Sequence, residues 1–185
     1  MIILLFGLLL FIGIHSLREL KLRDSLIARF GHNAYRGGFS IVAIAGLVLI
    51  VIGKSQAAFT MIYEPAFELQ IISHMLMLPA IILFVAGVLP RSHLRQLLIH
   101  PMLVGTMLWG AAHLWANGDV ASVLIFGSIG LWAVVKFVSL TINNLPTHQK
   151  PSLGWDVATL VLGLAIFRLI TEYHGQLFGI GISIV

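Results

Sequence analysis

The chain has 185 residues, of which 59% are apolar and only 10% are charged, and its mean hydropathy is +1.02. A soluble domain carries about 25% charged residues and needs a polar surface around its core. The composition therefore excludes a secreted domain, a cytosolic enzyme and a nucleic-acid-binding protein, and it predicts an integral membrane protein. The sequence has no cysteine, which excludes disulfides, Fe–S clusters and cysteine nucleophiles.

Six apolar stretches approach the length of about 20 residues that a helix needs to cross the hydrocarbon of a bilayer. In chain order they cover residues 1–16, 38–53, 69–89, 99–115, 120–141 and 155–178. We therefore expect an all-α fold, a bundle of about six transmembrane helices that forms a single domain over residues 1–185. The first stretch lacks a basic start and leads into His15 and Arg18 instead of a small-residue cleavage site, so we interpret it as a retained helix and not a signal peptide.

The basic residues predict how the bundle is oriented. The first loop carries five of the 11 Lys and Arg residues, whereas the second and fourth loops together carry only Lys54. Because cytoplasmic loops are enriched in Lys and Arg, the odd-numbered loops are expected in the cytoplasm. In a bacterium this places the protein in the inner membrane with both termini in the periplasm. Residues 17–29 mix charged with apolar side chains, which suits a helix lying along the membrane surface.

Histidines within the apolar stretches are the first candidates for a functional site, because ionisable groups inside a membrane are costly. Paired histidines on different helices of a bundle commonly hold haem. At about 1.5 Å per residue, His74 and His113 are expected within one helical turn of each other in depth. His15 lies nearer the cytoplasmic side with Arg18 one turn further on, and Trp109 stands one turn before His113. The alternative is that these histidines are hydrogen-bonded packing residues.

Other ionisable residues in or near the stretches are His100, Lys136, His174, Arg168 and Glu172. Arg168 and Glu172 are four residues apart and are expected to pair along one helix face. The pair has two interpretations, a structural ion pair or an arginine that binds an anion such as a haem propionate. The sequence contains no phosphate-binding loop, dinucleotide-binding motif or HExxH motif.

Four motifs of the chain are distinctive enough to compare with known families. The longest runs from His100 to Asp119 and reads HPMLxGxxxWxxxHLxANGD. The others are HSLR from His15, GxxAYRG from Gly31 and SHMLMLPA from Ser73. Together these motifs resemble those of the NnrU family, and the similarity covers nearly the whole chain.

The NnrU resemblance implies a small multi-spanning membrane protein associated with nitric oxide and denitrification metabolism. The family is similar to the zeta-carotene isomerases, which are membrane haem b enzymes. Carried over by motif, this similarity implies His15 and His113 as haem ligands, whereas depth favours His74 and His113. A cysteine that acts in ligand exchange in the isomerases would fall on Gly110, so a redox-switched mechanism is in doubt here.

Three functions follow as expectations. The first is a haem b membrane protein whose iron acts on a carotenoid-like polyene or another hydrophobic molecule, or on nitric oxide. The second is a non-catalytic accessory factor for a respiratory nitric oxide reductase. The third is a small transporter, against which the sequence shows no internal repeat.

Overall fold

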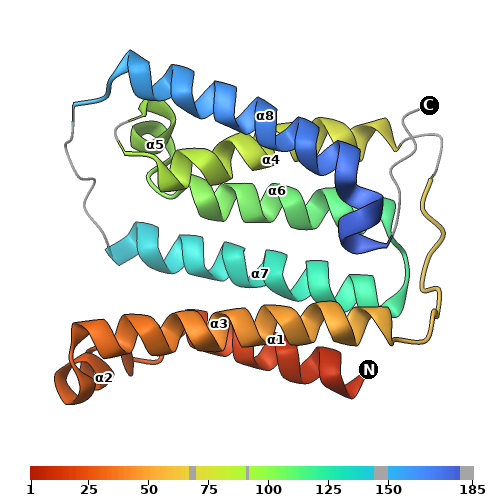
Figure 1. Cartoon of the computed structure of the whole chain (residues 1–185), viewed down its shortest axis with the longest axis horizontal. Coiled ribbons are helices and arrows are strands. Elements are labelled where there is room, and N and C mark those ends of the chain that lie inside the picture. Colours follow the sequence, from red (N-terminus) through yellow and green to blue (C-terminus); the bar gives the residue numbers. More distant parts are fainter. Residues whose placement is uncertain (67–69, 91, 144–149, 180–185) are drawn as a thin grey trace. The chain divides into compact units, whose positions relative to one another are not determined.

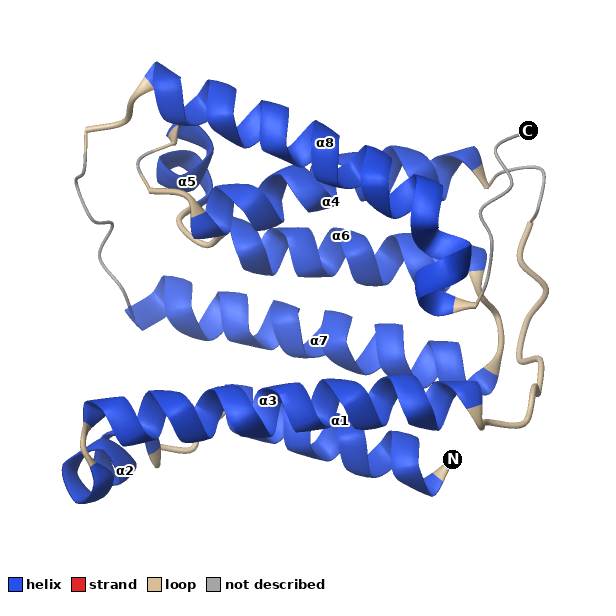
Figure 2. Cartoon of the chain, in the orientation of Figure 1, coloured by secondary structure: helices blue, strands red, loops and turns tan. Residues whose placement is uncertain are grey.

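The computed structural model of the chain describes residues 1–66, 70–90, 92–143 and 150–179. Helices joined by loops make up this part of the chain, as Figures 1 and 2 show. In chain order they are α1 (Ile2–His15), α2 (Arg23–Phe30), α3 (His32–Ser55), α4 (Ile71–Val88), α5 (His93–Leu98), α6 (Pro101–Ala116), α7 (Val120–Asn143) and α8 (Leu153–Phe178).

Each of the six apolar stretches contains one of these helices, so the expected all-α fold is confirmed. Four of the described helices, α3, α4, α7 and α8, are long and apolar enough to cross a membrane. The remaining two apolar stretches form the shorter α1, with 14 residues, and α6, with 16 residues. At about 1.5 Å per residue these two helices are shorter than the hydrocarbon of about 30 Å. The count of six spans therefore stays a prediction.

The chain divides into two compact units. The N-terminal unit comprises residues 1–63 and 118–128, which hold α1, α2, α3 and the start of α7. The C-terminal unit comprises residues 64–117 and 129–185, which hold α4, α5, α6, the rest of α7 and α8.

Glycines bring α1 and α3 into backbone contact within the N-terminal unit. A Cβ atom on Gly53 would lie 2.3 Å from the Leu4 nitrogen, and one on Gly7 would lie 2.7 Å from the Ile50 nitrogen. A Cβ atom on Gly46 would lie 2.9 Å from the Phe11 nitrogen. Small residues at such positions let two helices approach closely, which is how helices without a hydrophobic driving force associate in lipid.

The first-loop helix forms close to where the sequence places it, as α2 (Arg23–Phe30). It packs on α3 and has no buried residue.

A buried polar cluster fixes the opposite end of α3, and we call it the lysine cluster: Lys54, Asp119 and Ser122. The Lys54 Nζ atom lies 2.6 Å from Asp119 Oδ1 and 2.7 Å from Ser122 Oγ. Asp119 also accepts a hydrogen bond from the Ser122 backbone nitrogen at 3.1 Å and so caps the first turn of α7. Two connecting loops meet beside it, since Val120 N donates to Thr60 O at 2.9 Å.

In the C-terminal unit α4 packs against α6 and α8. Two glycines again allow close approach: a Cβ on Gly105 of α6 would lie 2.8 Å from the Ala80 carbonyl oxygen, and one on Gly163 of α8 would lie 2.8 Å from Ile82 Cγ1. The short α5 is tied to α8 because Asp156 accepts hydrogen bonds from the backbone nitrogen of His93 at 2.7 Å and from its ring.

Candidate functional site

Three histidines of the apolar helices share one hydrogen-bond arrangement. In each, ring atom Nδ1 contacts the backbone carbonyl oxygen four residues earlier: at 2.7 Å for His15, at 3.1 Å for His74 and at 2.9 Å for His113. A carbonyl oxygen only accepts, so Nδ1 must carry the proton. When such a ring is neutral, its lone pair therefore lies on Nε2, and this is the form of histidine that binds iron.

His74 stands out within this set. It is the fourth residue of α4 and half-buried, and its Nε2 atom is buried without a hydrogen-bond partner among the described residues. A buried acceptor left unsatisfied costs about 1–3 kcal/mol. His74 thus offers a desolvated lone pair that no other described side chain uses.

His113 lies in the last turn of α6 beside aromatic and ionisable neighbours. Its ring centroid is 5.1 Å from that of Trp109, the aromatic residue one turn earlier. His174, near the end of α8, lies close enough to His113 for an electrostatic interaction between the two rings. By sequence alone, His174 is only an ionisable residue in or near an apolar stretch, because nothing in its spacing indicates that it approaches His113.

Three histidines of the C-terminal unit lie at one end of its helices, whereas His93 and His100 lie at the other end, at the starts of α5 and α6. His74 lies at the start of α4, His113 at the end of α6 and His174 at the end of α8, and Figure 1 shows these three helix ends on the same side of the unit. Among the described residues no group of three or more His, Asp or Glu side chains could hold a metal ion. A haem iron needs only two axial ligands, which is the number that a pair of histidines supplies.

His15 belongs to the N-terminal unit. Its ring centroid lies 4.4 Å from that of Phe11 and 5.0 Å from that of Phe39, so it is packed between aromatic rings of α1 and α3. Arg18, the basic residue that follows His15 in the sequence, is exposed in the turn after α1.

Arg168 and Glu172 form the expected pair, with Arg168 Nη2 at 3.1 Å from Glu172 Oε2. Their side chains are 73% and 55% exposed. The pair therefore lies on the outside of α8, and the C-terminal unit does not bury it.

Gly110, the position of the cysteine in the isomerase-type motif, is buried in α6. A Cβ atom on Gly130 of α7 would lie 3.8 Å from the Gly110 Cα atom, an ordinary contact between two helices. No sulfur ligand is available at this position.

These features define an all-helical membrane protein. Its apolar helices carry histidines whose Nδ1 atoms contact a backbone oxygen, which leaves Nε2 as the atom that could bind a metal. The family model of the NnrU protein matches residues 3–182, and the chain belongs to this family. No curated protein and no solved structure matches the chain.

Proposed function

We propose that this NnrU-family protein binds haem b in the membrane through His113 and a second histidine, and that it acts in nitric oxide or denitrification metabolism. The observation that carries the proposal is the buried Nε2 atom of His74, which has no hydrogen-bond partner among the described residues. A nitrogen in this state is costly unless it binds something. Iron is one of the metals that an imidazole nitrogen suits.

The residues present fit a haem. The backbone bond to the Gln70 oxygen holds the His74 ring in the tautomer that a ligand needs, and the Trp109 oxygen does the same for His113. Trp109 and the apolar side chains of α4 and α6 would exclude water from the group. When bound, haem would supply an iron that changes oxidation state and binds small ligands such as nitric oxide.

The second ligand has two candidates. His74 shares a unit with His113 and lies at the matching end of the packed helices α4 and α6. His15 is the residue that the isomerase-type motif implies, and its Nδ1 atom makes the same bond to a backbone oxygen. Both therefore enter the experiment.

The experiment is a visible absorption spectrum of the detergent-purified protein, oxidised and then reduced with dithionite, after expression with added haem precursor. We expect a Soret band that shifts and sharpens on reduction and is lost in His113→Ala. Loss or displacement of the band in His74→Ala or His15→Ala identifies the second ligand.

The matched control is His32→Ala, because His32 is exposed at the start of α3 and has no place in the proposed site. It should leave the spectrum unchanged. A wild-type protein that stays colourless when haem is supplied, or a band that survives in His113→Ala, would contradict the proposal.

A second candidate function is a non-catalytic accessory role toward a respiratory nitric oxide reductase. Gly110 favours it, because ligand exchange by a cysteine is impossible in this chain. Nitric oxide reductase activity in membranes of a deletion strain tests this role. Nitric oxide reductase activity that falls in the deletion strain, and is restored when the strain expresses His113→Ala, would support an accessory role that needs no haem.

A further inference from the structure

An open groove of about 370 Å³ runs along α1 within the N-terminal unit. Its walls are residues of α1 between Leu5 and Gly13, together with Leu124 and Ser128 of α7. The only polar side chain among them, that of Ser128, donates to the Leu124 carbonyl oxygen. The groove therefore offers no unsatisfied polar group and suits an apolar occupant.

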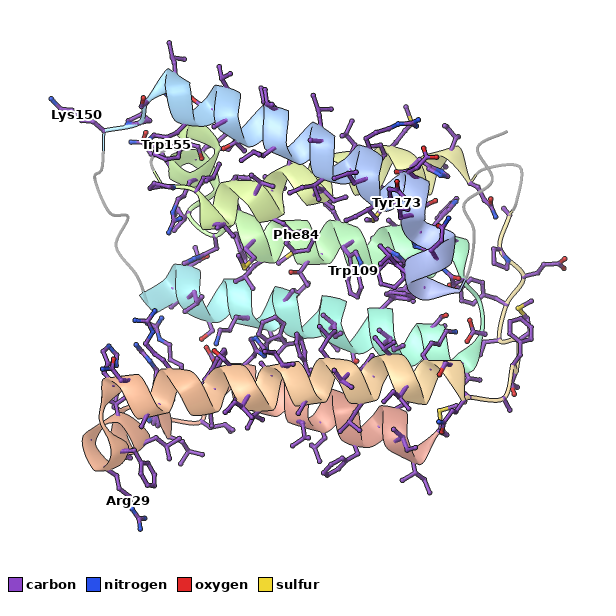
Figure 3. The ribbon with its side chains drawn as sticks, in the orientation of Figure 1. Arg29, Phe84, Trp109, Lys150, Trp155 and Tyr173 are labelled. Atoms are coloured by element: carbon purple, nitrogen blue, oxygen red, sulfur yellow. The ribbon has the colours of Figure 1, made fainter. Side chains whose placement is uncertain are left out.

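A basic and partly apolar surface follows directly after this groove; we call it the basic turn, residues 16–30. This segment carries more basic than acidic residues. Its four exposed basic residues are Arg18, Lys21, Arg23 and Arg29, and its two acidic residues are Glu19 and Asp24. Figure 3 shows Arg29 extending outward from α2.

Apolar side chains are exposed beside these charges. Leu20, Leu22 and Phe30 are 59%, 49% and 57% exposed. Exposed apolar residues next to Lys and Arg are typical of segments that lie in the headgroup region and attract anionic lipids.

The dimensions of the groove relate it to one leaflet of the bilayer. At about 1.5 Å per residue, the wall from Leu5 to Gly13 is about 12 Å long, and α1 ends two residues later, at His15. One leaflet contributes about 15 Å of hydrocarbon, half of about 30 Å. A polyene that crosses both leaflets would be too long for this groove, whereas a single acyl chain fits it.

We propose that the N-terminal unit binds one anionic phospholipid, with an acyl chain in the groove along α1 and its phosphate headgroup at the basic turn. The apolar walls accept the chain, and the excess of basic side chains favours a negatively charged headgroup over a zwitterionic one. This lipid site is independent of any haem bound by the histidines.

Native mass spectrometry of the detergent-purified full chain tests the site, with equimolar dioleoyl phosphatidylglycerol and dioleoyl phosphatidylcholine as probes. We expect wild type to retain the anionic lipid about tenfold more often than the zwitterionic one. Lys21→Gln with Arg23→Gln removes two charges that each contribute about fivefold, so it should abolish that preference.

Gly13→Leu tests the groove itself. An added Cβ on Gly13 meets no atom within 4 Å, so leucine can fill the groove without moving the backbone. We expect retention of both lipids to fall about tenfold. Gly127→Leu is the matched control, because Gly127 of α7 is equally open and does not line the groove.

Three results would overturn the proposal. They are equal retention of the two lipids by wild type, unchanged retention in Gly13→Leu, and complete displacement of the phospholipid by an added carotene. The last result would assign the groove to a polyene.

Discussion

The lysine cluster of the N-terminal unit and His74 of the C-terminal unit differ in whether their buried polar atoms are hydrogen-bonded. Asp119 is 5% exposed and Ser122 is 1% exposed, and Asp119 Oδ1, Lys54 Nζ and Ser122 Oγ are all joined by hydrogen bonds. His74 instead keeps a buried Nε2 atom that no described side chain or backbone group contacts by a hydrogen bond. A polar group whose bonds are complete stabilises a fold, whereas one left incomplete costs stability and points to a ligand.

The largest expected effect comes from breaking the lysine cluster. Asp119→Ala leaves Lys54 without its carboxylate and removes the cap of α7, so we expect a loss of about 2–4 kcal/mol of unfolding free energy. Thermal unfolding in detergent, followed by circular dichroism, measures it. Asp24→Ala, at an exposed position of α2, should change little. Equal effects of the two substitutions would contradict the structural role of the cluster.

The same cluster should make stability depend on pH. Burial by itself raises the pKa of Asp119, but hydrogen bonds from Lys54 and Ser122 and the charge of Lys54 outweigh it, so the pKa lies below that of an ordinary aspartate. A carboxyl with a lowered pKa contributes its stability above the unfolded value of about 3.9, and this is lost as the pH falls through the folded value.

Unfolding of wild type and Asp119→Asn at pH 7, 5, 4 and 3 tests this dependence. The difference in stability between them should be constant from pH 7 to 5 and shrink below pH 4. A difference that stays constant down to pH 3 would show that the Asp119 charge plays no part.

A smaller effect is expected from Ser122→Ala. The Oγ atom of Ser122 accepts a hydrogen bond from Lys54 Nζ, and the ion pair of Lys54 with Asp119 remains when this bond is removed. Removing one hydrogen bond costs about 1 kcal/mol. Unfolding of Ser122→Ala beside Ser128→Ala, whose hydroxyl contacts only its own helix, separates the cluster from a general serine effect.

The smallest expected effect is that of His74→Leu in the haem-free protein. The substitution removes a buried unsatisfied nitrogen together with one bond to a backbone oxygen, so the two terms nearly cancel. We expect a change within about 1 kcal/mol, in the stabilising direction. A loss of several kcal/mol would mean that His74 is a packing residue and would remove the contrast with the lysine cluster.

The sequence predicts the helices well and the contacts between them poorly. Hydropathy locates every apolar helix, and spacing predicts the pair of Arg168 and Glu172, because both depend on local chain geometry. The pair of Lys54 and Asp119 joins residues 65 positions apart, and no local pattern in the sequence specifies such a contact.

The candidate site shows the same limit. Depth along the helices suggested His74 and His113, and both lie at matching helix ends of one unit. The approach of His174 to His113 depends on how α8 packs, which no local pattern specifies. The unsatisfied state of His74 likewise depends on its neighbours in space.

The most direct test of haem binding by the histidines is thermal unfolding of the haem-free protein with and without added haem, for wild type and His113→Ala. A ligand at 100 times its dissociation constant adds about 2.7 kcal/mol to the folded state. We predict that haem raises the unfolding temperature of wild type and leaves that of His113→Ala unchanged. An equal shift in both proteins, or no shift in either, would contradict haem ligation by His113.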